Sequence, residues 1–325
     1  MRLGILARAD KGGLGYQSLA VWNYLKPAVT VVVDIGHRKR PPLAPDWYPD
    51  CPIVRWDGEN KLPGALELLS ECDVVWSAET FYDLDLTRAL AERGVASVLQ
   101  ANAELHDGQW SSTFWAPTAW MLDWLPDGTR VVEMPAPVDQ YPDLPSLEEP
   151  LRIVHPAGMP AVSDRNGTQI VSKARRVLEG KGWKLDVVGP SGSVRGTPMR
   201  FVNDPKDRDL GAAVCVLPRR YGGLSLPAIE ALCAGVPVIM PDAIPNRLWA
   251  TEMTEPHKHA SVSVKGGKVP AVATDPAQLV TAVANVLDDR RRLEGLRLEA
   301  RGWAEAHSWE RRRWRWLEAL DAAKL

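Results

Sequence analysis

The chain has 325 residues, of which 45% are hydrophobic and 25% charged, and its formal net charge is −2. This composition is typical of a globular protein, and the length suits two domains of about 150 residues each. No apolar run approaches the roughly 18 residues of a membrane-spanning helix, and the N-terminal apolar stretch is too short for a signal peptide. We therefore expect neither a membrane span nor a leader.

The four cysteines are scattered, without the paired spacing of a zinc site or a disulfide framework. A reducing cytoplasm is therefore the expected location. Residues 1–145 hold 12 Lys and Arg against 20 Asp and Glu, a net charge of −8, whereas residues 146–325 hold 27 against 21, a net charge of +6. This asymmetry favours a protein that binds an anionic small molecule mainly with its C-terminal half.

Short β-rich apolar runs alternate with helical patterns through the first half, which predicts parallel strands joined by crossover helices. The predicted strands are Arg2–Ala7, Val29–Asp34, Val74–Trp76, Ser97–Ala101 and Thr113–Ala116, and the predicted helices are Ser18–Leu25, Gly64–Leu69 and Leu84–Arg93. Together they indicate a doubly wound sheet.

The stretch from Met134 to Pro150 contains five prolines, a density that no periodic element tolerates, and is the predicted linker. A second series follows it. Its predicted strands are Arg152–His155, Lys184–Val188, Met199–Phe201, Ala213–Leu217, Val236–Met240 and Ala260–Val264, and its helices are Gln169–Gly180, Leu226–Ala234 and Ala277–Asp288. We predict an α/β fold of two sheets that leave a cleft, with ligands at the carboxyl ends of the strands.

The strongest motif runs from Tyr221 to Ile239: a predicted strand ends at Pro218, a glycine-bearing loop follows, and a helix begins near Pro227. Backbone N–H groups and the positive helix end would together hold a phosphate. Glu230 lies in about the first turn, where it could accept hydrogen bonds from ribose hydroxyls. A plain turn with a carboxylate favoured by the helix dipole has the same spacing, so spacing alone leaves both interpretations open.

This motif resembles the signature of glycosyltransferase family 4 and its GT-B relatives, Glu-Gly-Phe-Gly-Leu-Pro-x-x-Glu-Ala followed by Gly-x-Pro-Val. The matching residues are Gly223, Leu226, Pro227, Glu230, Ala231, Gly235, Pro237 and Val238. The resemblance implies that Glu230 binds the donor ribose and that the backbone of Gly223, Leu224, Ser225 and Leu226 binds the donor phosphates. Gly222 stands where the family has a glutamate that grips the transferred sugar.

The resemblance also implies the GT-B fold, in which two Rossmann-like doubly wound domains face a central cleft. The domains would be residues 1–145, on the acceptor side, and residues 146–307, which bind the donor. His307-Ser-Trp309-Glu310 resembles the Ser-Trp that opens the family's last helix, so residues 308–325 would cross back to the first domain.

Residues 155–168 resemble the family's Gly-Arg loop and Lys-Gly segment, which supply cations to the diphosphate. Met159 replaces the usual arginine and Asn166 the usual lysine, so Arg165 is the expected substitute cation; a solvated helix-capping loop is the alternative. Arg219 and Arg220 end the strand before the glycine loop. We expect one of them to contact the donor, although both could be ordinary surface arginines.

Gly12, Gly13 and Gly15 follow the first strand and resemble the family's Gly-Gly loop, where glycine lets the backbone approach a ligand. His106, followed by Asp107, lies about where the family has a His-Asp pair whose histidine reaches the donor sugar. A polar loop histidine is the alternative, and Glu104 competes as the site carboxylate.

The segments 164–168, 221–223 and 241–246 resemble glycosyltransferases encoded by tailed bacteriophages more than cellular enzymes. Such phage enzymes glycosylate hydroxylated DNA bases or virion proteins, so the resemblance implies a macromolecular acceptor and, for a phage protein, the host cytoplasm. The run Arg38, Lys39 and Arg40 favours DNA as the acceptor. The charge of −8 on the same half opposes DNA binding.

The resulting hypothesis is a retaining hexosyltransferase that moves a sugar from a UDP- or GDP-sugar co-substrate to a hydroxyl, without metal or other cofactor. Its candidate catalytic residues are His106, Arg165 and Glu230. A hydroxymethylated DNA base is slightly preferred as acceptor to a virion protein. A GT-B nucleotide-sugar epimerase and a sugar-binding pseudoenzyme remain alternatives.

Overall fold

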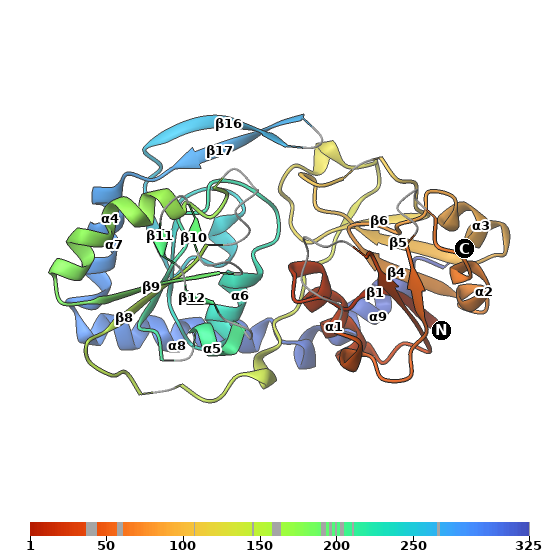
Figure 1. Ribbon diagram of the computed structural model, residues 1–325, viewed down its shortest axis with the longest axis horizontal. Coiled ribbons are helices and arrows are strands. Elements are labelled where there is room, and N and C mark those ends of the chain that lie inside the picture. The colour runs from red at the N-terminus through yellow and green to blue at the C-terminus, as the bar shows by residue number, and fades with distance from the viewer. Residues whose placement is uncertain are drawn as a thin grey trace. The chain divides into compact units, whose positions relative to one another are not determined.

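The computed structural model describes residues 1–36, 44–56, 61–106, 108–144, 146–157, 164–189, 193–194, 197–198, 200–201, 205–209, 211–264 and 267–324. The chain forms two compact units: Met1–Met134 together with Arg312–Leu325, and Pro135–Arg311. Each unit contains one large sheet with helices packed beside it (Figure 1).

The first unit is built on a seven-stranded parallel sheet in the order β3-β2-β1-β4-β5-β6-β7. Its strands are β1 (Leu3–Arg8), β2 (Val29–Asp34), β3 (Ile53–Arg55), β4 (Val74–Ala78), β5 (Ala96–Gln100), β6 (Thr113–Ala116) and β7 (Arg130–Val131). Its helices are α1 (Gly13–Leu25), α2 (Ala65–Leu69) and α3 (Leu86–Glu92), with 3₁₀ turns at Pro45–Trp47 and Leu122–Trp124. Strands β1, β4 and β5 are buried along their whole length, as expected for parallel strands covered on both faces.

The end of the chain packs into the first unit. Helix α9 (Trp309–Asp321) carries Trp316, whose ring lies 5.9 Å from that of Trp76 and 5.3 Å from that of Trp115, measured between centroids. The Trp316 indole N–H donates to the Glu133 carbonyl (2.9 Å). All three tryptophans are buried, so they fill the core rather than present stacking surfaces for a ligand.

The second unit is built on a six-stranded parallel sheet in the order β12-β9-β8-β13-β14-β15. Its strands are β8 (Arg152–Pro156), β9 (Lys184–Gly189), β12 (Arg200–Phe201), β13 (Val214–Val216), β14 (Val238–Pro241) and β15 (Glu252–Thr254). Its helices are α4 (Thr168–Gly180), α5 (Pro205–Asp209), α6 (Leu226–Cys233), α7 (Pro276–Leu287) and α8 (Arg290–Ala306), with 3₁₀ turns at Val138–Gln140 and Asn246–Leu248. The short hairpin β10 (Ser193–Val194) and β11 (Thr197–Pro198) stands beside the sheet.

One predicted strand of this series has a different place. Residues 260–264 belong to β16 (Lys258–Val264), which pairs antiparallel with β17 (Gly267–Ala273) outside the parallel sheet. The sheet takes β15 as its last strand instead. Alternating apolar residues such as Val262 and Val264 do indicate a strand, but the pattern carries no information about which strand pairs with it.

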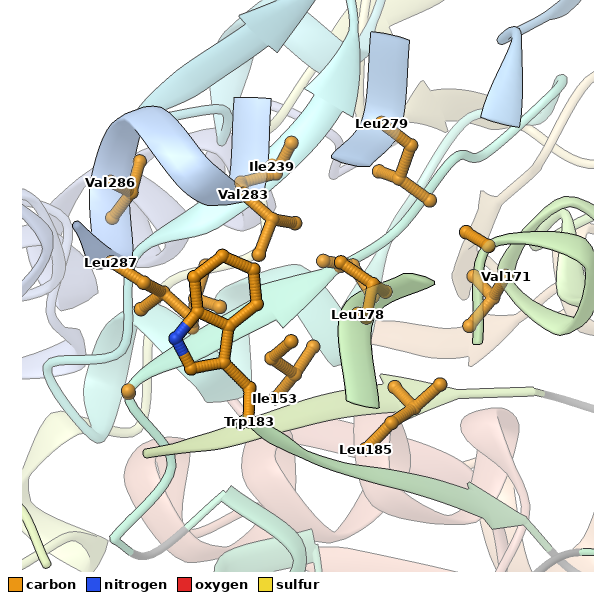
Figure 2. Close-up of a cluster of buried hydrophobic side chains, with 14 of the residues drawn as sticks. Ile153, Val171, Leu178, Trp183, Leu185, Ile239, Leu279, Val283, Val286 and Leu287 are labelled. Atoms are coloured by element: carbon orange, nitrogen blue, oxygen red, sulfur yellow. The ribbon is translucent and has the colours of Figure 1, made fainter. Parts of the chain in front are cut away.

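The core of the second unit lies between the sheet and the helices α4 and α7, which pack against each other. Figure 2 shows Ile153 and Leu185 from the sheet meeting Leu178 of α4 and Val283 of α7. Trp183, which precedes β9, packs among these side chains. This packing fixes the positions of the ends of β8 and β13, where the loops discussed below begin.

Both sheets have the strand order 3-2-1-4-5-6, with a seventh strand added in the first unit. In this order, the first three strands extend the sheet toward one edge and the later strands extend it toward the other edge. The switch point lies between the first and fourth strands, and in open α/β sheets ligands bind there, outside the carboxyl ends of the strands. The switch points lie between β1 and β4 in the first unit and between β8 and β13 in the second.

Candidate functional site

The switch point of the second sheet brings together two of the predicted donor-binding segments. The backbone N–H of Arg220, after β13, donates to the carbonyl of Arg165, which precedes α4 (2.8 Å). Asn166 is buried, and its side-chain amide donates to the carbonyl of Pro156 at the end of β8 (2.9 Å). The loops that follow the neighbouring strands β8 and β13 are therefore joined by hydrogen bonds.

The two arginines after β13 differ in environment. Arg219 is only 1% exposed, and its guanidinium donates to the carbonyl of Leu224 (2.7 Å), so it braces the glycine loop from within. The side-chain amide of Asn246 in turn donates to the Arg219 carbonyl (3.1 Å). Arg220 and Arg165 are half-buried and reach solvent.

The N-terminus of α4 is already capped by the chain itself. The carboxylate of Asp164 accepts the backbone N–H groups of Thr168 (2.7 Å) and Gln169 (3.1 Å). Gly167 lies against the end of β13: a Cβ there would stand 2.3 Å from the Pro218 carbonyl oxygen, and φ is +74°. Only glycine fits this close approach. These α4 amides are therefore not available to a phosphate while Asp164 holds them.

Helix α6 begins at Leu226, as the sequence predicts, with proline in its first turn. Its N-cap residue, Ser225, makes no side-chain capping bond. Within the described residues, Ser225 Oγ and Asn166 Oδ1 are buried oxygens without a hydrogen-bond partner. An unsatisfied buried polar group costs about 1–3 kcal/mol and calls for an explanation. Both oxygens belong to the segments that the sequence assigns to the donor.

Gly222 adopts φ of +114°, a backbone conformation that side-chain-bearing residues rarely take. It occupies the position where the family resemblance expects a glutamate. A glutamate here would strain the loop in its present form. The departure from the family signature thus has a local structural basis.

Glu230 lies on α6 and forms a buried ion pair with Arg208 of α5. Arg208 also contacts the carboxylate of Asp209 (2.8 Å from Nη2), so one guanidinium serves two acids. Burial, followed by the negative charges of Glu230 and Asp209, raises the pKa of Tyr141 well above its ordinary value. Sequence reasoning missed Arg208, because nothing in its local pattern indicates a partner 22 residues away.

His155, in β8, is fully buried at the same switch point. Its ring nitrogens lie 2.8 Å from the Val216 carbonyl oxygen and 2.9 Å from Thr168 Oγ1, linking β8 to β13 and to the start of α4. Burial lowers the pKa of His155 to about 4, so the ring is neutral at pH 7. It holds the loops in register rather than facing a ligand.

At the switch point of the first sheet, the glycine loop folds onto a buried ion pair between Arg8 and Asp10. The backbone N–H of Gly12 donates to Asp10 Oδ1 (2.9 Å). A Cβ on Gly15 would lie 1.7 Å from the Asp10 carbonyl oxygen. Gly15 thus has a packing reason to be glycine that is independent of any ligand. Gly13 is the first residue of α1.

Further polar groups gather at the ends of β4 and β5. Asn102 donates to the Glu79 carboxylate (2.5 Å), and Gln100 donates to Gln17 of α1 (2.9 Å). Glu79 adopts φ of +62°, a conformation uncommon for a residue with a side chain. No sequence motif marks any of these residues, because each is a lone polar side chain.

His106 is half-buried in the same region, and its ring meets that of Phe114 edge to face at 5.7 Å. Its backbone N–H donates to the Asn102 carbonyl (3.0 Å). The competing carboxylate, Glu104, is buried. Asp107 and the predicted acceptor-binding residues Arg38, Lys39 and Arg40 lie outside the described residues.

None of the helices that the structure describes is both long and apolar enough to cross a bilayer. Across the described ranges, no group of three or more His, Cys, Asp and Glu side chains is arranged to hold a metal ion.

No family model and no curated protein matches the sequence. Solved structures do match. Sucrose-phosphate synthase from Thermosynechococcus elongatus has 15% identity and a TM-score of 0.63, and the match covers 99% of each chain. An alpha-glucosyltransferase in complex with UDP has 10% identity and a TM-score of 0.62, again over 99% of each chain. The chain has the GT-B fold.

An alpha-glucosyltransferase in complex with UDP and a 13-mer DNA containing an HMU base also matches, with 10% identity and a TM-score of 0.57, over 99% of this chain and 98% of that one. At identities of 10–15%, these matches establish the GT-B fold and do not assign residues. Roles for Arg165, Arg220 and Glu230 must therefore be argued from their own contacts.

Proposed function

We propose that this GT-B protein is a glycosyltransferase that moves a sugar from a UDP-sugar to a hydroxyl group, with a hydroxymethylated base in DNA as the preferred acceptor. The observation that carries the proposal is the main-chain hydrogen bond from Arg220 to Arg165, which joins the loops after β8 and β13 at the switch point. Two arginines in these joined loops, followed along the chain by the N-terminus of α6, suit a diphosphate.

In the proposed reaction, the bond between the anomeric carbon and the diphosphate oxygen breaks, and the acceptor oxygen bonds to the same carbon. The nucleoside diphosphate leaves and takes the acceptor's proton. Arg165, Arg220 and the backbone at 223–226 would stabilise the charge that develops on the leaving phosphate. Glu230, held by Arg208, would accept hydrogen bonds from the donor ribose.

The choice of donor and acceptor draws support from two structural neighbours, one in complex with UDP and one in complex with UDP and DNA. We further propose that the anomeric configuration is retained, as the family resemblance implies. GDP-sugars remain the second choice of donor. His106 would reach the donor sugar, and Arg38, Lys39 and Arg40 would contribute to acceptor binding.

The decisive experiment is to incubate the protein with UDP-glucose, other UDP-sugars or GDP-sugars and a duplex containing hydroxymethylated bases. The DNA is then digested to nucleosides, and mass spectrometry detects a hexose adduct. NMR of the product reports the anomeric configuration. If sugar is found on a virion protein and none on DNA, the acceptor is the protein and not DNA. An altered nucleotide sugar without transfer would indicate an epimerase, and no turnover of any donor would indicate a sugar-binding pseudoenzyme.

A further inference from the structure

The strands β16 and β17 form a two-stranded ribbon that joins neither parallel sheet (Figure 1). Each strand has seven residues, and the pairing runs from Lys258 with Ala273 to Val264 with Gly267. A lone two-stranded ribbon is at best marginally stable in water. Here Val269 and Ala271 are buried and hold β17 in place, whereas β16 is exposed along most of its length.

Side chains alternate between the two faces of a strand, and directly paired residues share a face. His259, Ser261 and Ser263 of β16 therefore lie on one face with their partners Val272, Pro270 and Lys268 of β17. Val272 is buried, and the other five are exposed. We call these five residues the polar face of the ribbon. Their side chains are two hydroxyls, an imidazole, an ammonium group and one proline ring.

The ribbon is also basic in sequence. Between residues 256 and 274 there are three lysines and two histidines and no aspartate or glutamate, in a chain whose overall net charge is −2. Lys258, at the base of the ribbon, is exposed like Lys268 but lies on the opposite face, because it pairs with Ala273. Glu255 and Asp275 stand just outside this stretch, and within it the basic and hydroxyl groups fit a polyanion.

The base of the ribbon lies at the same sheet edge as the two arginines. The ribbon follows the carboxyl end of β15, and the backbone N–H of Val272 donates to the carbonyl of Arg220 (2.9 Å). Thr254 and Thr274, at the two ends of the ribbon, are joined through their hydroxyls (3.3 Å). A ligand held along the ribbon would therefore extend from the proposed donor site.

We propose that the ribbon, through its polar face and through Lys258, binds the phosphate backbone of duplex DNA and holds the acceptor beside the proposed donor site; this rests on the DNA-acceptor part of the proposed function. Seven residues span about 23 Å, and the major groove of B-DNA, about 12 Å wide, admits a two-stranded ribbon. A protein partner would require apolar or aromatic anchors, which the polar face lacks. A membrane surface would require an exposed apolar face.

The test compares the Lys258→Ala/Lys268→Ala variant with Lys173→Ala/Arg176→Ala, which removes the same charge from exposed positions of α4. Binding of a fluorescent 20-base-pair duplex is measured by anisotropy from 50 to 200 mM salt, without any donor. Each lost phosphate contact lowers the slope of log affinity against log salt by about 0.9. We expect a slope reduced by about 1 to 2 and affinity at 100 mM salt about 10- to 60-fold lower in the ribbon variant only.

A second variant, Ser261→Glu/Ser263→Glu, places two negative charges on the polar face at exposed positions and should abolish duplex binding. Calorimetric titration with UDP shows whether each variant keeps the donor site. If the ribbon variants bind DNA as tightly as the wild type or as the α4 control, the ribbon proposal is wrong. The proposed glycosyltransferase function would still stand in that case. A wild-type protein that transfers sugar to a protein and binds no duplex would overturn both the ribbon proposal and the DNA acceptor.

Discussion

The carboxyl edges of the two sheets share a strand order but differ in how they use charge. In the first unit, the buried guanidinium of Arg8 is paired with Asp10 within the glycine loop, and Glu79 and Glu104 add further carboxylates. In the second unit, Arg165 and Arg220 are half-buried and are joined through their main chains. The same topological position can therefore hold an arginine inside a buried ion pair or two arginines that are partly exposed. Buried oxygens without a hydrogen-bond partner occur at both edges, among them Gln100 Oε1 in the first unit and Asn166 Oδ1 in the second.

Both edges depend on glycines that allow the loops to close. Gly15→Ala and Gly167→Ala should each destabilise the unit that contains it by at least the roughly 1–3 kcal/mol typical of overpacking. The added Cβ atoms would stand 1.7 Å from the Asp10 carbonyl and 2.3 Å from the Pro218 carbonyl. Thermal unfolding combined with hydrogen exchange of each unit measures the effect.

The control for these variants is Gly302→Ala, in α8, where an added Cβ meets no atom within 4 Å. Alanine should be neutral there or stabilise the helix by up to about 1 kcal/mol. A Gly15→Ala protein with wild-type exchange in the first unit would contradict the close approach that we describe.

Removing Arg208 should cost about 3–5 kcal/mol, because two buried carboxylates, Asp209 and Glu230, would lose their shared partner. The Arg208 side chain is 12% exposed, so solvent screens this pair little. Denaturant unfolding of Arg208→Met is compared with that of Arg208→Met/Glu230→Gln, which removes one charge from the cluster. We expect the double variant to recover part of the loss. Glu230→Gln alone completes the cycle, and additive costs for the two changes would show that the pair contributes no coupling.

The stability of the second unit should depend on pH through His155. His155 is neutral in the folded chain because burial lowers its pKa from an ordinary 6.5 to about 4. Unfolding lets the ring take up a proton, so its contribution to stability is complete above pH 6.5 and falls as the pH drops toward 4. The total loss is about 3 kcal/mol, at 1.36 kcal/mol for each pKa unit.

Hydrogen exchange of β8 and α4 between pH 7 and 4.5, corrected for intrinsic rates, would detect this loss in the second unit. A His155→Gln variant should be less stable at pH 7 and lack the titration, since glutamine does not ionise in this range. A wild-type protein whose β8 amides keep constant protection down to pH 4.5 would contradict the neutral, buried assignment.

The sequence predicts most of the regular structure because buried parallel strands are continuous apolar runs. Val29–Asp34 and Thr113–Ala116 are predicted with the bounds that they have in the structure. It does not predict β3 or β7, which have only three and two residues and are too short to show a period. It also misses α8, whose surface is dominated by arginine and glutamate.

The candidate site divides in the same way. The motif places Arg165, Arg220 and Glu230 on segments that follow particular strands, and topology then brings Arg165 and Arg220 together. The partner that fixes the Glu230 side chain, Arg208, comes from a distant part of the chain. The turn at Gly222 depends on a backbone torsion. Periodicity and spacing carry neither kind of information, so a sequence can nominate such residues without orienting them.

The smallest effects test whether Arg165 and Arg220 contact a diphosphate. Arg165→Ala and Arg220→Ala should each weaken UDP binding by about 1.5–3 kcal/mol, the scale of a charge-assisted hydrogen bond, or roughly 10- to 150-fold. Uridine binding should change little, because the nucleoside carries no phosphate. Lysine variants keep the charge and lose the planar fork, so they should recover only part of the affinity. Calorimetry with both ligands measures the difference, and Lys173→Ala controls for the general loss of positive charge. Equal losses for UDP and uridine would mean that the two arginines shape the loop, as Arg219 does, and that the cationic edge contacts no phosphate.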